Sequence, residues 1–186
     1  IIVRKCLISW KINNPDWNII ELNNSNLKNY IDLEKEIKNF KTKSISKASL
    51  SDIIRIIILE KYGGIWCDAT TLCTQPINNF IKNIKEDFFA FSFKNKNDRL
   101  ISSWFLYAKP NSYIVKKWKE KTIDYVNNLN DIGGLIKDTF NLWKVNKYKD
   151  KHYFWFHYLF TDLNLKDFKF KNIWDDSNKV YNFHSH

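Results

Sequence analysis

The chain has 186 residues, of which 44% are hydrophobic and 17% aromatic, and its formal net charge is +10. A disordered chain is poor in aromatic residues and cannot bury enough apolar surface to fold, so this composition excludes disorder. The length fits a single domain over residues 1–186. No stretch approaches the roughly 20 apolar residues of a membrane span. Three cysteines at spacings that match neither a zinc site nor a redox pair favour a reducing compartment.

Lysine carries almost all of the positive charge, because arginine occurs only at Arg4, Arg55 and Arg99. A protein that reads bases would favour arginine for its bidentate fork. A lysine surplus suits diffuse attraction to anionic lipid headgroups or to an anionic substrate such as a nucleotide diphosphate. A solvated surface that reflects nucleotide bias in the genome is the simpler explanation of most of these lysines.

The first predicted elements are a helix, a strand and a second helix. Apolar residues recur at helical spacing over residues 2–10, and Asn13-Asn14-Pro15 ends that segment. Residues 17–22 predict a short strand, and a polar helix around residues 33–40 follows it. The strongest helix prediction covers residues 46–62. Ser49 and Asp52 resemble a capping box at its start, and Gly63-Gly64 is a natural stop at its end.

The remaining elements alternate between strands and helices. Residues 65–67 predict a buried strand that ends at Asp68, and residues 88–93 and 102–108 predict two more strands. Residues 111–126, 134–148 and 153–160 have helical patterns. This order predicts an α/β fold with helices on the faces of a sheet. Ligands of such sheets bind beyond the carboxyl ends of the strands, which is where Asp68 falls.

Asp52 and Arg55 are charged residues on an otherwise apolar helix. They lie three positions apart, so they share one face, while the residues around them are apolar nearly all round. Charges on a buried helix must pair or face a polar cavity. An internal ion pair that only steadies the helix would explain these two residues alone. Asp68 at a strand tip can hold a cation or a ribose, although a turn-capping Asp is the common alternative.

The run SDIIRIIILEKYGGIWCDAT, residues 51–70, resembles the donor-binding core of glycosyltransferase family 32. More closely, it is similar to the bacterial capsular polysaccharide synthesis proteins of that group. The resemblance continues through residues 71–76, returns at Ser103-Trp104-Phe105 and Ala108, and returns again at residues 153–157. It therefore covers most of the chain, and its first block is specific.

This resemblance implies a GT-A-like fold, which is a Rossmann-type nucleotide-sugar-binding sheet flanked by helices. It implies that Asp52 and Arg55 contact hydroxyls of the donor sugar, and that Asp68 matches the first Asp of a DxD motif near ribose and metal. Asp68 is therefore the catalytic candidate. The expected substrate-binding residues lie in the matching blocks: Ser51, Asp52, Arg55, Gly64, Asp68, Thr70 and Trp104. Trp104 suits a sugar platform, but core packing explains it equally well when it is taken alone.

The resemblance also implies a divalent cation, Mn²⁺ or Mg²⁺, held by Asp68. Thr70 stands where many relatives carry the second Asp, and a hydroxyl is a weak ligand. His184 near the end of the chain is a further metal candidate, since such enzymes often bring a C-terminal histidine to the metal or diphosphate, although a frayed chain end is the commoner explanation of a terminal histidine pair. His157, in an aromatic run, is expected to be a core histidine whose hydrogen bonds are satisfied. Relatives usually begin with a strand that helps to hold the base, so we expect this chain to be incomplete at its N-terminus.

The sequence thus predicts an enzyme that transfers a sugar, with retention of configuration, from a nucleotide-sugar donor to a glycan or lipid-linked glycan acceptor. Such transfer serves capsular or other surface polysaccharide synthesis. We expect the protein in the cytoplasm, with peripheral contact to anionic membrane at the inner face of the plasma membrane. The alternative is a basic, aromatic-rich module that binds nucleic acid or anionic membrane. No nucleic-acid motif is visible, so nucleic acid is not an expected partner.

Overall fold

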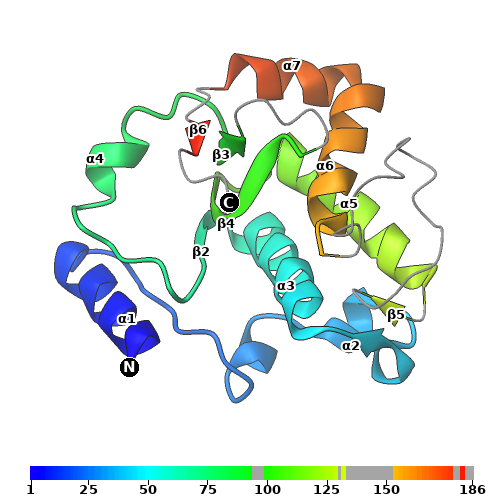
Figure 1. Cartoon of the computed structure of the whole chain (residues 1–186), viewed down its shortest axis with the longest axis horizontal. Coiled ribbons are helices and arrows are strands. Elements are labelled where there is room, and N and C mark those ends of the chain that lie inside the picture. The colour runs from blue at the N-terminus through cyan, green and yellow to red at the C-terminus, as the bar shows by residue number, and fades with distance from the viewer. Residues whose placement is uncertain (94–98, 130, 133–152, 178–180, 183–186) are drawn as a thin grey trace.

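The computed structural model describes residues 1–93, 99–129, 131–132, 153–177 and 181–182. Figure 1 shows a central sheet with helices packed around it. The longer elements are helices α1 (Ile2–Asn13), α3 (Lys47–Tyr62), α5 (Tyr113–Asn127), α6 (Trp155–Lys166) and α7 (Phe168–Asp176), and strands β2 (Gly64–Cys67), β3 (Phe88–Phe93) and β4 (Ile101–Ala108). The shorter ones are α2 (Leu33–Glu36), α4 (Asn78–Ile81), β1 (Ser44–Ile45), β5 (Asp131–Ile132), β6 (Tyr181–Asn182) and the 3₁₀ turns Leu27–Asn29 and Phe40–Thr42.

The main sheet has the strand order β2-β4-β3-β6. Strand β4 runs antiparallel to both β2 and β3, and the two residues of β6 pair with β3 in parallel. Strands β1 and β5 form a separate parallel pair. The predicted mixture of strands and helices is therefore confirmed as a small, mainly antiparallel sheet flanked by helices.

Helix α3 is held at both ends by local signals in the sequence. The Ser46 hydroxyl caps its start by accepting a hydrogen bond from the Ser49 backbone N–H at 3.2 Å. The cap therefore lies one turn earlier than the box predicted at Ser49 and Asp52. Gly63 ends the helix with a φ of 67°, and a Cβ at this position would lie 2.8 Å from the Pro110 nitrogen. The predicted glycine stop is thus confirmed, because only glycine tolerates both the angle and the close approach.

Each face of the sheet carries its own apolar cluster. Side chains of α3, α5, α6 and α7 pack with one face, around Ile56, Trp118 and Phe160, none of which exposes any measurable surface. A smaller cluster around Phe89 and Phe105 covers the other face. Residues 105–108 of β4 alternate between these clusters, as the two-residue period of a strand requires. Both faces of the central strand are therefore buried.

Two predicted elements differ from the structure. Residues 17–22 form no strand, because no described strand pairs with them. The helix predicted around residues 33–40 is only the single turn α2, because the chain becomes extended at Ile37 and Asn39 takes a left-handed φ of 54° before the next 3₁₀ turn. The helix predicted over residues 134–148 lies outside the described residues.

In the described part of the chain, no helix combines the length and the apolar character needed to cross a membrane.

Candidate functional site

A cavity of about 880 Å³ opens beside α3 and β2 and is bounded on its far side by α1 and residues 17–22. Its wall is polar where α3 faces the end of β2 and apolar toward α1. The polar part of the wall includes Asn14, Ser51, Asp52, Arg55, Asp68, Thr71, Ser103 and His157. The apolar part includes Val3, Leu7, Trp10, Trp17, Ile19, Ile20, Leu22, Ile58 and Ile65. The size suits a small organic ligand with both polar and apolar parts.

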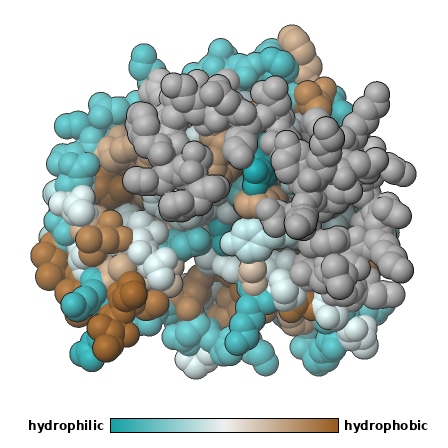
Figure 2. Space-filling model, in the orientation of Figure 1, coloured by the Kyte–Doolittle hydropathy of each residue, from teal (hydrophilic) through white to brown (hydrophobic). Residues whose placement is uncertain are grey.

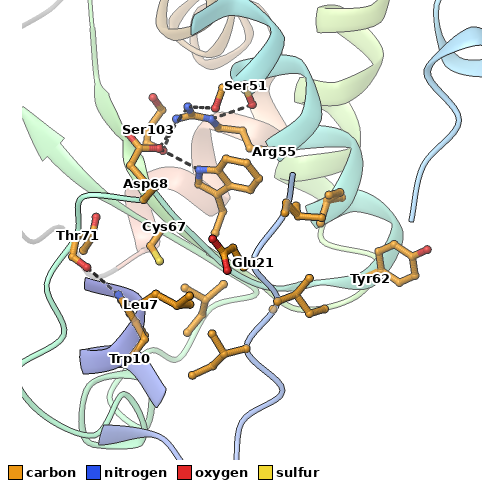
Figure 3. Close-up of a pocket in the computed structure, with 18 of the residues that line it drawn as sticks. Leu7, Trp10, Glu21, Ser51, Arg55, Tyr62, Cys67, Asp68, Thr71 and Ser103 are labelled. Carbon is orange, nitrogen blue, oxygen red and sulfur yellow. Dashed lines mark hydrogen bonds and ion pairs between the residues drawn. The ribbon is translucent and has the colours of Figure 1, made fainter. Parts of the chain in front are cut away.

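Arg55 is the centre of the polar wall (Figure 3). Its Nη2 lies 3.3 Å from Asp52 Oδ1 and 3.4 Å from Asp68 Oδ1. The same nitrogen donates a hydrogen bond to the Ser51 hydroxyl at 3.1 Å, and Nη1 donates to the Ser103 carbonyl at 2.6 Å. Arg55 and Asp52 are only 5% and 7% exposed, so these contacts are shielded from water. Asp52 and Arg55 are thus more than an ion pair within one helix, because Arg55 also connects α3 to Asp68 after β2 and to Ser103 in β4.

Asp68 directly follows β2 and is fixed by its neighbours. Its backbone N–H donates to the Trp104 carbonyl of β4 at 2.8 Å. Its Oδ1 accepts a hydrogen bond from the Trp66 indole N–H at 3.1 Å. The Trp66 ring also lies beneath the Arg55 guanidinium, 5.3 Å from ring centroid to Cζ. The Asp68 side chain is still 41% exposed, so it remains accessible at the mouth of the cavity.

Burial dominates the electrostatics of Asp52. Loss of water raises the pKa of its carboxyl to about 7, with the Arg55 charge acting to lower it and the Asp68 charge acting to raise it. Arg55 is within ion-pair distance, but its charge is shared with Asp68. It therefore offsets only part of the rise in the Asp52 pKa that burial causes. Asp52 therefore takes up a proton far more readily than an exposed aspartate does.

The structure brings most of the predicted site residues to one place. Ser51, Asp52, Arg55, Gly64 and Asp68 all line the cavity. Gly64 has a φ of 91°, and a Cβ placed on it would meet no atom within 4 Å, so its role is conformational.

Three other predicted residues are not part of this wall. Thr70 is exposed and does not line the cavity. Trp104 does not line the cavity and stacks on Phe91 at a centroid distance of 4.9 Å, within the smaller apolar cluster. His184 lies outside the described residues.

Trp66 and His157 are among the lining residues that were not predicted as site residues. Trp66 was overlooked although it lies inside the matching block, and its position two residues before Asp68, which places both side chains on one side of the strand, was the available signal. His157 was expected to be a satisfied core histidine, and it is indeed buried. However, it lines the cavity, and its Nδ1 has no hydrogen-bond partner in the described part of the chain.

Asp68 is suited to bind a cation whose other ligands come mainly from a bound substrate. The described residues contain no group of three or more His, Cys, Asp or Glu side chains that could hold a metal ion by themselves. Mg²⁺ and similar cations are commonly bound by one or two carboxylates while substrate phosphates supply further oxygens. One partly exposed carboxylate at the cavity mouth is compatible with that arrangement.

The chain is thus an α/β protein with a cavity whose wall carries a linked group of charged side chains. Residues 1–133 match the family model described as capsular polysaccharide synthesis protein. The chain therefore belongs to the capsular polysaccharide synthesis protein family. No curated protein and no solved structure matches the chain significantly.

Proposed function

We propose that this protein is a glycosyltransferase that moves a sugar from a nucleotide-sugar donor to a growing glycan in capsular or other surface polysaccharide synthesis. The observation that carries the proposal is the linked Asp52–Arg55–Asp68 group on the wall of a cavity of about 880 Å³. The family assignment and the resemblance of residues 51–70 to glycosyltransferase family 32 support it. A GT-A-like donor site, a DxD-like role for Asp68 and transfer with retention are parts of the same proposal.

The residues of the wall have distinct proposed roles. Asp52 offers a carboxylate to donor sugar hydroxyls inside the cavity, where hydrogen bonds are stronger than in water. Arg55 has its N–H groups engaged by Ser51, Ser103 and the two carboxylates, so it mainly orients these groups and supplies one buried positive charge. Catalysis then rests on positioning the donor and on stabilising charge as the diphosphate departs.

Asp68 would hold a divalent cation, Mn²⁺ or Mg²⁺, together with the donor phosphates. When bound, such a cation supplies positive charge for the departing diphosphate. Trp66 keeps the Asp68 carboxylate in place through the indole hydrogen bond at 3.1 Å. Trp66 is therefore a positioning residue in this proposal.

A ligand screen tests the proposal directly. Thermal unfolding of the full chain would be measured with UDP-glucose, UDP-galactose, UDP-N-acetylglucosamine and GDP-mannose, each with and without MnCl₂. A ligand present at 100 times its dissociation constant adds about 2.7 kcal/mol of stability. We expect at least one sugar nucleotide to raise the melting temperature, and an absence of any shift with the whole panel would contradict the proposal.

The alternative of a nucleic-acid-binding module receives no support from the tryptophans, although Tyr62, Tyr153 and Phe168 are exposed. Binding of single strands needs exposed rings on which bases can stack. None of the tryptophans in the described part of the chain is exposed, and Trp104, Trp118 and Trp155 pack against other rings. We therefore retain the enzyme as the proposed function.

Helix α1 supports the further proposal that the protein contacts anionic membrane at the cytoplasmic face. Its inner side carries the buried Cys6, while Leu7 and Trp10 face the cavity. Its outer side exposes Ile8 and Ile12, at 45% and 72%. The helix contains Arg4, Lys5 and Lys11 and no acidic residue. Figure 2 shows apolar side chains gathered at the position of α1. An apolar side flanked by cations matches the interface of an anionic bilayer.

This surface predicts a salt-sensitive interaction with vesicles. The full chain should sediment with phosphatidylglycerol-containing vesicles more than with pure phosphatidylcholine vesicles, and salt should weaken the interaction because it screens the charges. The double variant I8S/I12S should bind the anionic vesicles less. Phe168→Ser, at a 78% exposed residue on α7, is the matched control and should bind like the wild type. Equal binding to both kinds of vesicle, or none to either, would contradict the proposal.

A further inference from the structure

Strand β2 lies at the edge of the main sheet, and its outer edge borders the cavity. Its one neighbour among the described strands is β4. The Asp68 N–H donates to the Trp104 carbonyl, and in an antiparallel ladder every second residue bonds to the same neighbouring strand. Ile65 and Cys67 therefore turn their backbone N–H and C=O groups away from β4, and both residues line the cavity.

Residues 17–22 line the same cavity and also lack a partner strand. Residues 18–22 make no backbone-to-backbone hydrogen bond with any other described residue. Their apolar pattern nevertheless predicts a strand. Two stretches with free backbone groups thus border one cavity. An added strand can connect them, because a strand forms hydrogen bonds along both of its edges.

Helix α1 indicates which polypeptide would fill this space. Parallel neighbours in a sheet need a crossover of a dozen or more residues, usually a helix. Helix α1 has 12 residues and leads through residues 14–16 into residues 17–22, so it has the length and the position of such a crossover. Its Val3 and Leu7 also line the cavity. A strand that came before α1 would return through this helix and pair with residues 17–22 in parallel.

We propose that the apolar part of the cavity is a slot for one more β-strand, which is formed by polypeptide that precedes Ile1 and lies between residues 17–22 and β2. The added strand would span about five residues. Leu7 and Trp10 of α1 and Ile58 of α3 offer it apolar contacts. The strand should therefore be apolar at nearly every position, as strands that are buried on both faces are.

The slot and the charged group occupy different parts of the cavity. The slot runs along β2, whereas Asp68 follows the last residue of that strand and meets Arg55 there. The added strand would close the apolar side of the cavity and leave the polar side open to a ligand. A strand in this slot requires no sugar nucleotide, so it can be tested whether or not the proposed function holds.

Amide hydrogen exchange, followed by NMR, tests the slot. It would be measured for the chain of 186 residues and for a longer chain that starts at the initiator Met of the same gene. We expect the Ile65 and Cys67 amides to exchange on the order of 100-fold more slowly in the longer chain, because a ladder hydrogen bond opens only together with the structure around it. Trp66 is the matched control, since its N–H points to β4 and should be protected in both chains. Unprotected Ile65 and Cys67 amides in the longer chain would overturn the proposal.

Proline substitutions provide a second readout. Cys67→Pro removes an N–H that faces the slot, and proline is tolerated where the N–H of an edge strand faces outward. This variant should lower the urea midpoint of the longer chain clearly more than that of the 186-residue chain. Trp66→Pro removes a bond to β4 and should lower both midpoints alike. Equal effects of Cys67→Pro on the two chains would count against the slot. Protection of Ile65 and Cys67 that appears in the 186-residue chain and grows with its concentration would mean that a second copy fills the slot, and the proposal would be wrong.

Discussion

Asp68→Asn should reduce sugar transfer by about 100-fold or more while the protein stays folded. Losing one preorganised stabilising group costs ~3 kcal/mol in the transition state, and Asp68 is the only carboxylate that the DxD-like segment retains. An Asn side chain keeps an oxygen for the Trp66 indole, which lies 3.1 Å from Asp68 Oδ1 in the wild type. The geometry is thus preserved while the charge is removed. Donor hydrolysis or transfer by the full chain, with folding checked by circular dichroism, gives the measurement.

Thr70→Ala is the matched control for Asp68→Asn. Thr70 lies two residues away, but it is exposed and does not line the cavity. Its loss should change turnover less than about twofold, since exposed substitutions usually change free energies by no more than 0.5 kcal/mol. A folded Asp68→Asn protein with near-normal turnover would show that Asp68 is only a turn residue, and the proposed catalytic role would then fail.

Arg55→Leu should lower the free energy of unfolding by about 3–5 kcal/mol. Removing one partner of a buried ion pair leaves the other charge unpaired in a medium that solvates it poorly. Here one substitution removes the cation from Asp52 and Asp68 together, and it also removes the hydrogen bond to the Ser103 carbonyl. Chemical denaturation of the full chain measures the change. Loss of less than about 1 kcal/mol would contradict this account of Arg55.

The effect of Arg55→Leu should grow as the pH rises from 5 to 8. In the wild type the pKa of Asp52 is raised to about 7, mainly by burial. A carboxyl whose pKa is higher in the folded state contributes stability that is complete below its unfolded pKa and is lost as the pH rises through its folded pKa. Without Arg55 the folded pKa of Asp52 rises further. At pH 5 the Asp52 carboxyl is then protonated and needs no cation beside it. At pH 8 the folded variant must either hold an unpaired buried carboxylate or keep a proton that the unfolded chain releases, and both cost stability.

Lys119→Leu provides a control outside the cavity. Lys119 also bridges two carboxylates, those of Glu36 and Glu60, each at 3.1 Å, but its side chain is 21% exposed and theirs are 30% and 31% exposed. Water can solvate the freed carboxylates, so this substitution should cost only about 1 kcal/mol. It should not alter binding of sugar nucleotides.

Elements with strong local signals were the ones that the sequence predicted well. Helix α3 has a serine cap, a nearly continuous apolar run and a glycine stop, and it forms over Lys47–Tyr62 as expected. The segment at residues 17–22 has a strand-like pattern but no regular structure, because a strand depends on a partner that local pattern does not specify. The second predicted helix ends at Glu36, because the chain becomes extended at Ile37 and then left-handed at Asn39, which hydrophobic spacing could not indicate.

The candidate site was predicted as far as the matching block extends. Asp52, Arg55 and Asp68 meet on one cavity because helical spacing and a strand tip place them together. Sequence could not decide between a sugar platform and core packing for Trp104, because residue type alone does not say what a side chain of β4 packs against; in the structure it stacks on Phe91. His157 was judged by its apolar neighbours, and only the three-dimensional position reveals that one side of its environment is a cavity.

The shared dependence of the site on β4 has a consequence for its dynamics. The carbonyl of Ser103 accepts from Arg55, and the carbonyl of the next residue, Trp104, accepts from the Asp68 backbone. These adjacent carbonyls belong to a strand that is paired on both edges and covered on both faces. Such strands open to solvent only in rare, near-global unfolding events, as slow amide hydrogen exchange reveals. The spacing between Arg55 and Asp68 is therefore tied to β4, the central strand of the sheet.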